Sequence, residues 1–376
     1  MTDMLADPRH DSRAAAPAPG TAAAHRDATR LTNEHPALRA YWHPVARIDD
    51  VSSEPQRFVV LGQPLVVVRL DDSIEVFADA CPHRAARLSD GCVVDGDLQC
   101  PYHGWRFGGA GRCTLIPALG PQAPAATRMR AGTPTTLEAH GLVWVAFGPA
   151  RHDPLPIPEM DDPSFVAAWL PPVSVRCGAA QFIDNFLDFA HFPFVHAGTF
   201  GAGEDELVGD YDVERTSQGL RVRYEHVINN HEDPLVGTGE HPLLQTRVME
   251  YTYRAPFSGR LRLEYPLTDV VNTIVVWAVP ETAATTRLHQ VLLRNDIATP
   301  AEGAAAVAYE LAVLDEDLRI LEHLPDQALD LDPTAQAHTR ADRITVELRR
   351  LLREVVAGDE PPSPGAPVDR PLLAKD

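Results

Sequence analysis

The chain has 376 residues, of which 44% are hydrophobic and 23% charged, as in a globular protein with a sizeable core. Its 53 acidic and 33 basic residues give a formal net charge of −20, which repels phosphate backbones and anionic lipid surfaces, so we expect neither nucleic acid nor membrane as a partner. Lys375 is the single lysine, which excludes Schiff-base catalysis and P-loop phosphate binding because both need a positioned lysine.

Residues 1–35 are rich in Ala, Pro, Asp and Arg and have no periodicity, which predicts a disordered tail. Acidic residues interrupt this segment and it has no apolar stretch, so neither a secretory signal nor a transit peptide fits. No run of the sequence is apolar enough to span a membrane. The odd and low count of five cysteines favours a reducing compartment, and we expect a cytoplasmic protein.

Residues 36–150 predict an all-β domain, because short runs of β-forming residues alternate with turn residues. These runs are 58–61, 65–70, 74–77 and 141–147. Four prolines between 151 and 163 break regular structure and predict a domain boundary near residue 150.

Residues 151–360 predict a second domain, in which strands precede two helices. The expected strands are 220–227, 246–254, 260–267, 272–279 and 287–294, and the expected helices are 302–324 and 338–356. The sequence therefore predicts an α+β protein, with an N-terminal all-β domain and a C-terminal antiparallel sheet with flanking helices. Residues 361–376 are expected to form a C-terminal tail.

Two loops of the first domain each combine one cysteine with one histidine. Cys81 and His83 form the first pair, Cys100 and His103 the second, and 16 residues separate His83 from Cys100. A structural zinc site is one interpretation, but zinc fingers usually pair Cys with Cys and His with His along the chain. A second interpretation is the chance burial of four unrelated residues. The two loops also resemble a known iron–sulfur motif, in which two thiolates and two imidazoles hold the cluster. The remaining cysteines are expected in the core: Cys92, Cys113 and Cys177.

A carboxylate and two histidines form a second cluster, in a segment that predicts a helix entering a loop. Asp188 and His191 share one face of this helix with Asp184. On an unbroken helix His191 and His196 would point about 140° apart, so we expect the helix to end near Pro193 and His196 to turn back. Two histidines beside a carboxylate are the start of a 2-His-1-carboxylate site for Fe(II), and the alternative is a set of buried core histidines.

The helix expected at 302–324 offers the third ligand. On its helical wheel Asp317 lies among apolar side chains, whereas Asp315 and Glu316 point toward water. A carboxylate that faces the core is costly unless it is paired or binds a metal, so we predict Asp317 as the ligand. Glu310 lies on the same arc and is the competing candidate.

Together the two clusters resemble those of the Rieske non-haem iron oxygenases, in their oxygenase (α) component. The first signature, C-x-H…C-x2-H, is described above; the second, N-x2-D-x2-H-x4-H, is present as Asn185, Asp188, His191 and His196. The late carboxylate helix of the family is present as Glu316-Asp317 followed by Glu322. The chain length and the segment 198–201 are similar to the vanillate O-demethylase, dicamba monooxygenase and methylxanthine N-demethylase types, whereas His323-Leu324 departs from the usual glutamine.

The resemblance assigns roles to these residues. It implies a Rieske [2Fe–2S] cluster on Cys81, His83, Cys100 and His103, and a mononuclear Fe(II) on His191, His196 and Asp317. It also implies that Asp188 links this iron to a cluster histidine of a neighbouring subunit, in a head-to-tail ring that is usually a homotrimer. Asn185 belongs to the same motif and is predicted as a catalytic residue with Asp188.

The chain has no flavin or nicotinamide fingerprint, so electrons must come from a separate ferredoxin or NAD(P)H reductase. We expect O2-dependent monooxygenation of a small aromatic or heterocyclic molecule, as O- or N-demethylation or hydroxylation, in the catabolism of aromatic compounds. The alternative outcome is ring cis-dihydroxylation, and the alternative of another class is a Rieske-type electron carrier. Four residues in the sheet region could touch substrate or satisfy backbone groups, and we favour the second: Asn230, His231, His241 and Asn272.

Overall fold

The computed structural model describes residues 29–120, 129–201, 204–231 and 233–358. The predicted tails lie mainly outside these ranges, but residues 29–35, which were predicted as part of the N-terminal tail, lie within the described structure. Strand β1 (Arg30–Leu31) pairs antiparallel with β20 (Leu329–Asp330), and the side chain of Leu31 is buried. Backbone pairing and an apolar contact therefore order residues that composition alone had assigned to the tail.

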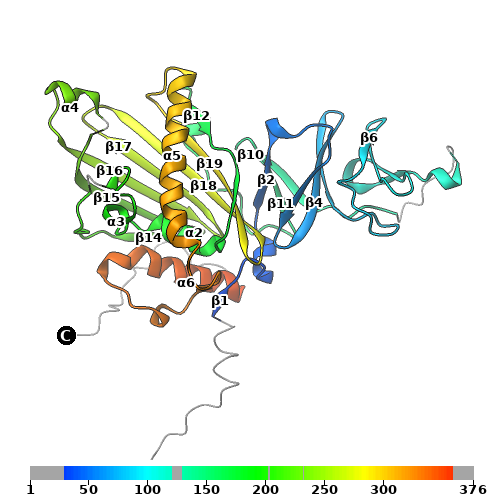
Figure 1. The fold of residues 1–376 in the computed structure, drawn as a ribbon. Helices are drawn as coiled ribbons and strands as arrows, with labels where there is room; N and C mark the ends of the chain where they lie inside the picture. The colour runs from blue at the N-terminus through cyan, green and yellow to red at the C-terminus, as the bar shows by residue number, and fades with distance from the viewer. Residues whose placement is uncertain (1–28, 121–128, 202–203, 232, 359–376) are drawn as a thin grey trace, which may run out of the picture.

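The N-terminal part consists of three small antiparallel sheets, as predicted for an all-β domain (Figure 1). The first contains β2 (His43–Arg47), β10 (Thr135–Ala139) and β11 (Leu142–Ala146). The second contains β3 (Gln56–Val60), β4 (Gln63–Leu70) and β5 (Ser73–Ala78). The third contains β6 (Cys92–Val94), β7 (Asp97–Gln99), β8 (Arg106–Phe107) and β9 (Cys113–Leu115), and it lies at one end of the molecule.

The C-terminal part is built on an eight-stranded antiparallel sheet. Its strands are β12 (Val166–Trp169), β13 (Val173–Val175), β14 (Val213–Arg215), β15 (Gly219–Asn229), β16 (Leu244–Arg254), β17 (Ser258–Tyr265), β18 (Val270–Thr282) and β19 (Thr285–Arg294). The five predicted strands correspond to β15–β19 and are confirmed. The predicted boundary near residue 150 lies in the segment between β11 and β12.

Helices cover one face and one end of this sheet (Figure 1). They are α2 (Ala179–Leu187), α3 (Phe192–Val195), α4 (Pro234–Thr238), α5 (Pro300–Leu321) and α6 (Arg343–Ala357). Helix α5 begins where Thr299 and Glu302 cap each other's backbone N–H groups, and it crosses the sheet face. The expected α+β arrangement is therefore confirmed. No helix of the described residues is both long and apolar enough to cross a membrane.

The helix that precedes the two histidines ends earlier than predicted. Helix α2 ends at Leu187, and Asp188 already has extended backbone angles. Pro193 does not end this helix but lies in the first turn of α3, where its missing N–H leaves no hydrogen bond unmade. Asp184 lies inside α2 and its carboxylate forms an ion pair with Arg349 at 2.6 Å, whereas Asp188 follows the last residue of the helix.

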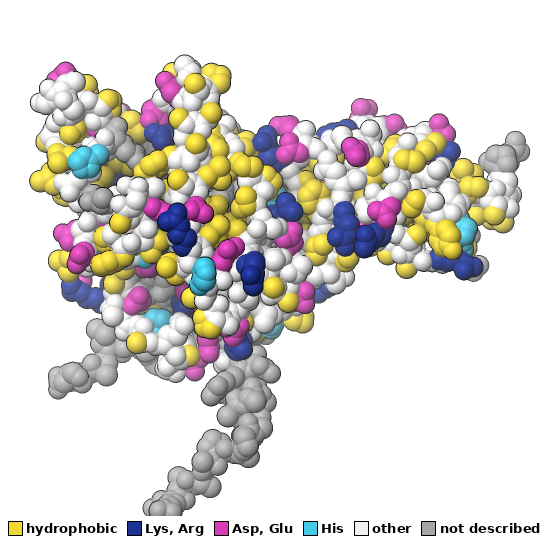
Figure 2. Space-filling view, in the orientation of Figure 1, with side chains coloured by type: hydrophobic (Ala, Val, Ile, Leu, Met, Phe, Trp, Pro, Cys, Tyr) yellow, Lys and Arg dark blue, Asp and Glu magenta, His cyan; other side chains and the backbone are white. Residues whose placement is uncertain are grey.

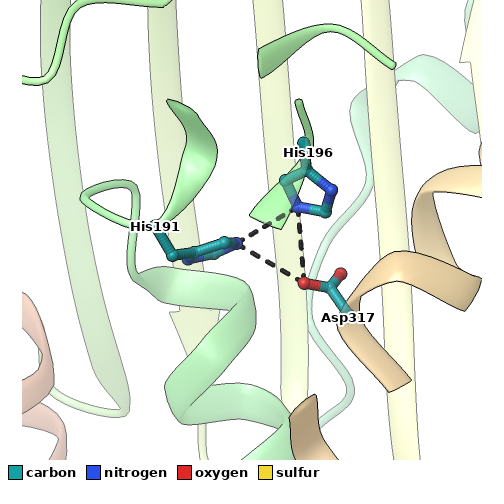
Figure 3. Close-up of side chains that lie close together, drawn as sticks. All are labelled: His191, His196 and Asp317. Atoms are coloured by element: carbon teal, nitrogen blue, oxygen red, sulfur yellow. Dashed lines mark hydrogen bonds and ion pairs between the residues drawn. The ribbon is translucent and has the colours of Figure 1, made fainter. Parts of the chain in front are cut away.

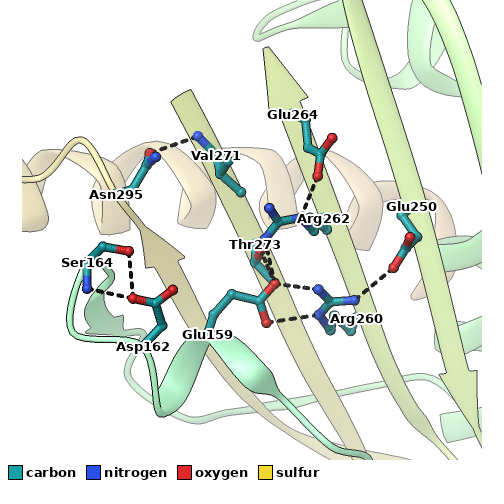
Figure 4. A network of polar contacts seen from close by, with 10 residues as sticks. All are labelled: Glu159, Asp162, Ser164, Glu250, Arg260, Arg262, Glu264, Val271, Thr273 and Asn295. Atoms are coloured by element: carbon teal, nitrogen blue, oxygen red, sulfur yellow. Dashed lines mark hydrogen bonds and ion pairs between the residues drawn. The ribbon is translucent and has the colours of Figure 1, made fainter. Parts of the chain in front are cut away.

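The linker between the two parts is attached to the outer face of the large sheet (Figure 4). Glu159, in a short 3-10 helix (Pro158–Met160), is 3% exposed and accepts hydrogen bonds from Arg260, Arg262 and Thr273. A buried carboxylate needs such partners, because an unpaired one would destabilise the folded protein by on the order of several kcal/mol. The network fixes the strands whose opposite face lines the cavity described below.

Contacts between the N-terminal sheets and the large sheet run through the hairpin of β18 and β19. The backbone N–H groups of Leu61 and Gly62 donate to Pro280 O and Glu281 O, at 2.8 and 2.9 Å. Asn33 donates to Thr282 O at 3.0 Å on the same hairpin. On the visible surface, acidic and basic side chains are interspersed rather than gathered by sign (Figure 2).

Candidate metal centres

Three side chains from separate elements meet above the sheet (Figure 3). His191 lies between α2 and α3, His196 ends α3, and Asp317 lies on α5. The two Nε2 atoms are 3.2 Å apart, and Asp317 Oδ1 lies 3.5 Å from His191 Nε2 and 3.3 Å from His196 Nε2. In the described residues these three form the group whose ligand atoms converge within 4.8 Å. Glu310, the competing candidate, lies in the nearby cavity wall instead.

The donor set fits a divalent iron, because two imidazoles and one carboxylate are the ligands of mononuclear Fe(II) oxygenases. Electrostatics point the same way. Burial raises the pKa of Asp317, but hydrogen bonds from His191, His196 and Asn185 outweigh it and lower the pKa to about 2. Burial lowers the pKa of His191, yet Asp188 and Asp317 raise it to about 9. These carboxylates therefore create a site that favours a cation, either a proton or a metal ion.

Asp188 and Asn185 orient the first half of this site. His191 Nδ1 donates to Asp188 Oδ2 at 3.0 Å. This hydrogen bond leaves Nε2 directed at His196 and Asp317. Asp188 itself is held by the backbone N–H of Ala190 at 3.1 Å. Asn185 Nδ2 donates to Asp317 Oδ1 at 2.9 Å. The structure thus brings together all five residues that the sequence analysis assigned to this centre.

Glu316 orients the second half, and the sequence analysis placed it wrongly. It was expected in water, whereas its side chain is 8% exposed and accepts hydrogen bonds from His196 Nδ1 at 3.1 Å and from Thr199 Oγ1 at 2.7 Å. The helical wheel counted only apolar neighbours and could not include the loop after His196, which covers this side of α5. Asp315 is exposed as expected and pairs with Arg319 at 2.6 Å.

The segment 198–201 explains how that loop fits so closely. A Cβ atom on Gly198 would lie 2.5 Å from Glu316 Oε1, and one on Gly201 would lie 2.1 Å from Phe192 O. Phe200, between them, stacks on the His196 ring with centroids 4.7 Å apart. Side chains at positions 198 and 201 would therefore displace the groups around His196, and glycine avoids this. The pattern G-T-F-G in the sequence indicated this close approach.

A cavity of about 100 Å³ lies beside the three residues, between α5 and the sheet. Its apolar lining includes Phe182, Phe186, Phe192, Phe200, Met249, Leu261, Leu263, Ile274, Leu292, Val313 and Leu314. Among its polar lining residues, Tyr251 has a buried hydroxyl and Asn272 a buried Oδ1 without a hydrogen-bond partner in the described structure. Of the four sheet-region candidates, only Asn272 lines this cavity; Asn230 and His241 instead bond Gln245 and Asp233.

The two Cys/His loops meet at the end of the N-terminal part. Cys81 and Cys100 are 3% and 2% exposed, and the rings of His83 and His103 lie at the surface with centroids 4.6 Å apart. Burial raises the pKa of the Cys81 thiol to about 11, and the adjacent Cys100 adds to this shift. Cysteine binds metals as the thiolate, and two adjacent buried cysteines beside two histidines form a donor set that fits a metal centre. Cys113 and Cys177 are buried as expected, but Cys92 is exposed.

Comparison with known families identifies these centres. Residues 41–135 match the Rieske [2Fe-2S] domain, and residues 175–358 match the vanillate O-demethylase oxygenase C-terminal domain. The chain belongs to the Rieske non-haem iron oxygenases. This membership decides against the zinc interpretation, and the oxygenase domain decides against a pure electron carrier. Enzymes of this family use a Rieske [2Fe–2S] cluster and a mononuclear iron, and they receive electrons from a separate reductase.

One relative covers most of this Rieske oxygenase and another covers about half of it. Methylxanthine N1-demethylase NdmA of Pseudomonas putida is 27% identical over 335 residues, which are 86% of this chain and 91% of the relative. The dicamba O-demethylase oxygenase component of Stenotrophomonas maltophilia is 34% identical over 190 residues, 47% of this chain and 55% of the relative. A solved structure of Pseudomonas putida NdmA with caffeine shares the fold, with a TM-score of 0.73 at 24% identity over 86% of this chain and 93% of that one.

Proposed function

We propose that this oxygenase component removes an O- or N-methyl group from a small aromatic or heterocyclic substrate. The observation that carries the proposal is the position of His191, His196 and Asp317 at the wall of an apolar cavity, inside the domain type that the family uses for oxygen activation. Relatives that span most of the chain are N-demethylases, and a shorter match is an O-demethylase.

In this proposal His191, His196 and Asp317 hold Fe(II), and a [2Fe–2S] cluster is held by Cys81, His83, Cys100 and His103. When bound, the iron activates O2 and the cluster supplies electrons. The reaction balances as methylated substrate, O2, two electrons and two protons giving demethylated substrate, formaldehyde and water. The hydroxylated methyl carbon forms a hemiacetal or hemiaminal, which breaks at the bond between that carbon and the oxygen or nitrogen that carries it.

The protein's own groups set up this reaction. Phenylalanines of the cavity exclude water from the methyl carbon, which suppresses reactions with solvent. Asp188 and Glu316 each accept the Nδ1 proton of one histidine, so both Nε2 atoms stay available as ligands. Asn185 fixes the carboxylate of Asp317.

We further propose a head-to-tail homotrimer. The β6–β9 sheet, which carries the Cys/His loops, lies at one end of the molecule (Figure 1). Helix α3, beside the iron site, lies at the other end. Electrons that leave one cluster therefore have a shorter path to the iron of a neighbouring subunit, through Asp188, whose carboxylate is 25% exposed beside His191. Sedimentation of the purified protein should give three chains per particle, and a stable active monomer would contradict the ring.

Product analysis tests the proposed reaction. The protein is purified anaerobically, its iron and acid-labile sulfide are measured, and methoxy- and N-methyl-substituted ring compounds are supplied with a surrogate reductase. We expect three irons and two sulfides per chain, and formaldehyde equal to the demethylated product. A cis-dihydrodiol without formaldehyde would replace demethylation by ring dihydroxylation, and a protein without the third iron would refute both.

A further inference from the structure

The arginines that line the cavity both lie in ion pairs. Arg247 lies in its wall, and its guanidinium bonds Glu204 Oε1 at 2.7 Å; the two side chains are 4% and 5% exposed. Arg294 lies in the same wall and forms two hydrogen bonds with Asp296, at 2.8 and 2.7 Å. Each arginine that lines the cavity in the described structure therefore already has a carboxylate partner.

On the iron side of the cavity, the charge of Asp317 offsets part of the charge of the iron that it would hold with His191 and His196. Away from the iron, an anionic ligand would lose its hydration without an arginine that is available to neutralise it. Burial of such a charge is costly unless it is paired. The charges of the wall thus disfavour a substrate with a carboxylate.

Two neutral amides also line the cavity. Asn272, on β18, has its Oδ1 buried without a partner in the described structure. Gln290, on β19, is 6% exposed, and no described residue hydrogen-bonds its side-chain amide. In the β18–β19 register the pair Ile274 and Leu292 lies between the positions of these two residues. The cavity floor is therefore apolar in the middle, with an amide on either side.

Buried polar groups without partners are rare in native proteins, and each costs about 1–3 kcal/mol. A ligand removes that cost when it offers an N–H to an amide oxygen and a carbonyl to an amide N–H. An uncharged ring with an amide-type group does both, whereas a carboxylate has no hydrogen to donate to Asn272 Oδ1.

We propose that the substrate is an uncharged aromatic or heterocyclic molecule with an amide-type group, in which a carbonyl lies beside an N–H, and that the cavity discriminates against carboxylates. The inference rests on the proposed function, which makes this cavity the substrate site. It narrows the substrate class from any small aromatic or heterocyclic compound to neutral, hydrogen-bonding ones.

A matched pair of ligands tests this class. Meta-methoxybenzamide and meta-methoxybenzoate have the same shape and the same methyl ether, and they differ in one amino group against one charged oxygen. Their affinities for the anaerobic, iron- and cluster-loaded protein are measured by calorimetry. We expect the amide to bind at least about tenfold more tightly, as expected when a site leaves hydrogen-bonding groups unpaired with the wrong ligand.

Three variants assign the preference to the amides. Asn272→Leu keeps the branched shape of the side chain and Gln290→Leu removes the second amide, and at least one should lower the affinity for the amide about tenfold without lowering that for the carboxylate. Val271→Leu is the control, since adjacent residues of a strand point to opposite faces. Removal of an unpaired buried acceptor should not lower the melting temperature of Asn272→Leu, whereas a structural asparagine would show a loss.

Equal affinities, tighter binding of the carboxylate, or an amide affinity unchanged in both leucine variants would each overturn the inference. Failure of the amide to bind at all would overturn it as well. The proposed function fails separately: binding with the expected preference but without formaldehyde would refute demethylation only. Demethylation of the benzoate in preference to the amide would refute the substrate class and leave the function standing.

Discussion

Gly198→Ala should weaken iron binding although residue 198 is not a ligand. The added Cβ would lie 2.5 Å from Glu316 Oε1, too close for any real contact, so the carboxylate must move. Gly198 has no positive φ, which makes the effect steric rather than a strain of the backbone. The carboxylate that moves is the one that accepts from His196 Nδ1 at 3.1 Å.

The size of the effect follows from that hydrogen bond. Its acceptor is charged and buried, and a bond of this kind contributes about 1.5–3 kcal/mol. At about 1.4 kcal/mol per factor of ten, its loss weakens Fe(II) affinity roughly 10- to 100-fold, the range found when partners of metal-binding histidines are removed. The [2Fe–2S] cluster lies in another domain and should be unaffected.

The affinity is measured anaerobically by competition with a chromogenic Fe(II) chelator, and the visible absorbance of the cluster serves as internal control. Gly148→Ala is the matched variant, because a Cβ there meets nothing within 4 Å. A second change, Glu316→Asp, shortens the displaced side chain and should recover part of the loss in Gly198→Ala. Unchanged iron affinity in Gly198→Ala would refute the role assigned to Glu316.

Three further outcomes are expected. Asp188→Asn should keep both metals, by iron and sulfide analysis, but nearly abolish steady-state turnover; full activity would contradict the electron path through Asp188. Asp317→Ala should lose the mononuclear iron and keep the cluster, and retained iron would favour Glu310 as ligand. Burial lowers the pKa of His191, but Asp188 and Asp317 raise it to about 9 in the metal-free fold, above the ordinary histidine value of 6.5. Protonated His191 therefore stabilises the iron-free protein fully below pH 6.5, the pKa of an ordinary histidine. This stabilisation is lost as the pH rises through the folded-state pKa of about 9, so the melting temperature should fall over that range. A rise of the melting temperature would refute this assignment.

Much of the fold was predictable because the relevant interactions are local or periodic. Strands β15 and β16 alternate more and less buried side chains over much of their length, and this period survives in the sequence. Strands β18 and β19 are buried over most of their length and are recognisable by their runs of β-forming residues instead. The convergence of the Cys/His loops and of the His191, His196 and Asp317 side chains was predictable for another reason, since metal chemistry restricts both residue type and spacing. Pro193 misled because proline ends one helix as readily as it begins the next, and only the backbone of Asp188 shows which occurs.

Contacts between distant segments were the part that the sequence could not supply. Glu316 precedes Asp317, the proposed iron ligand, and on an isolated helix that position turns away from the apolar side. The loop of 198–201 folds over that position, and Thr199 and His196 then make Glu316 a buried acceptor. Two glycines around Thr199-Phe200 were the available signal, because small residues at fixed spacing after a ligand indicate that another chain segment lies against them. The same reasoning applies to Gln290, whose role depends on the cavity that α5 closes over the sheet and not on any feature of its own strand.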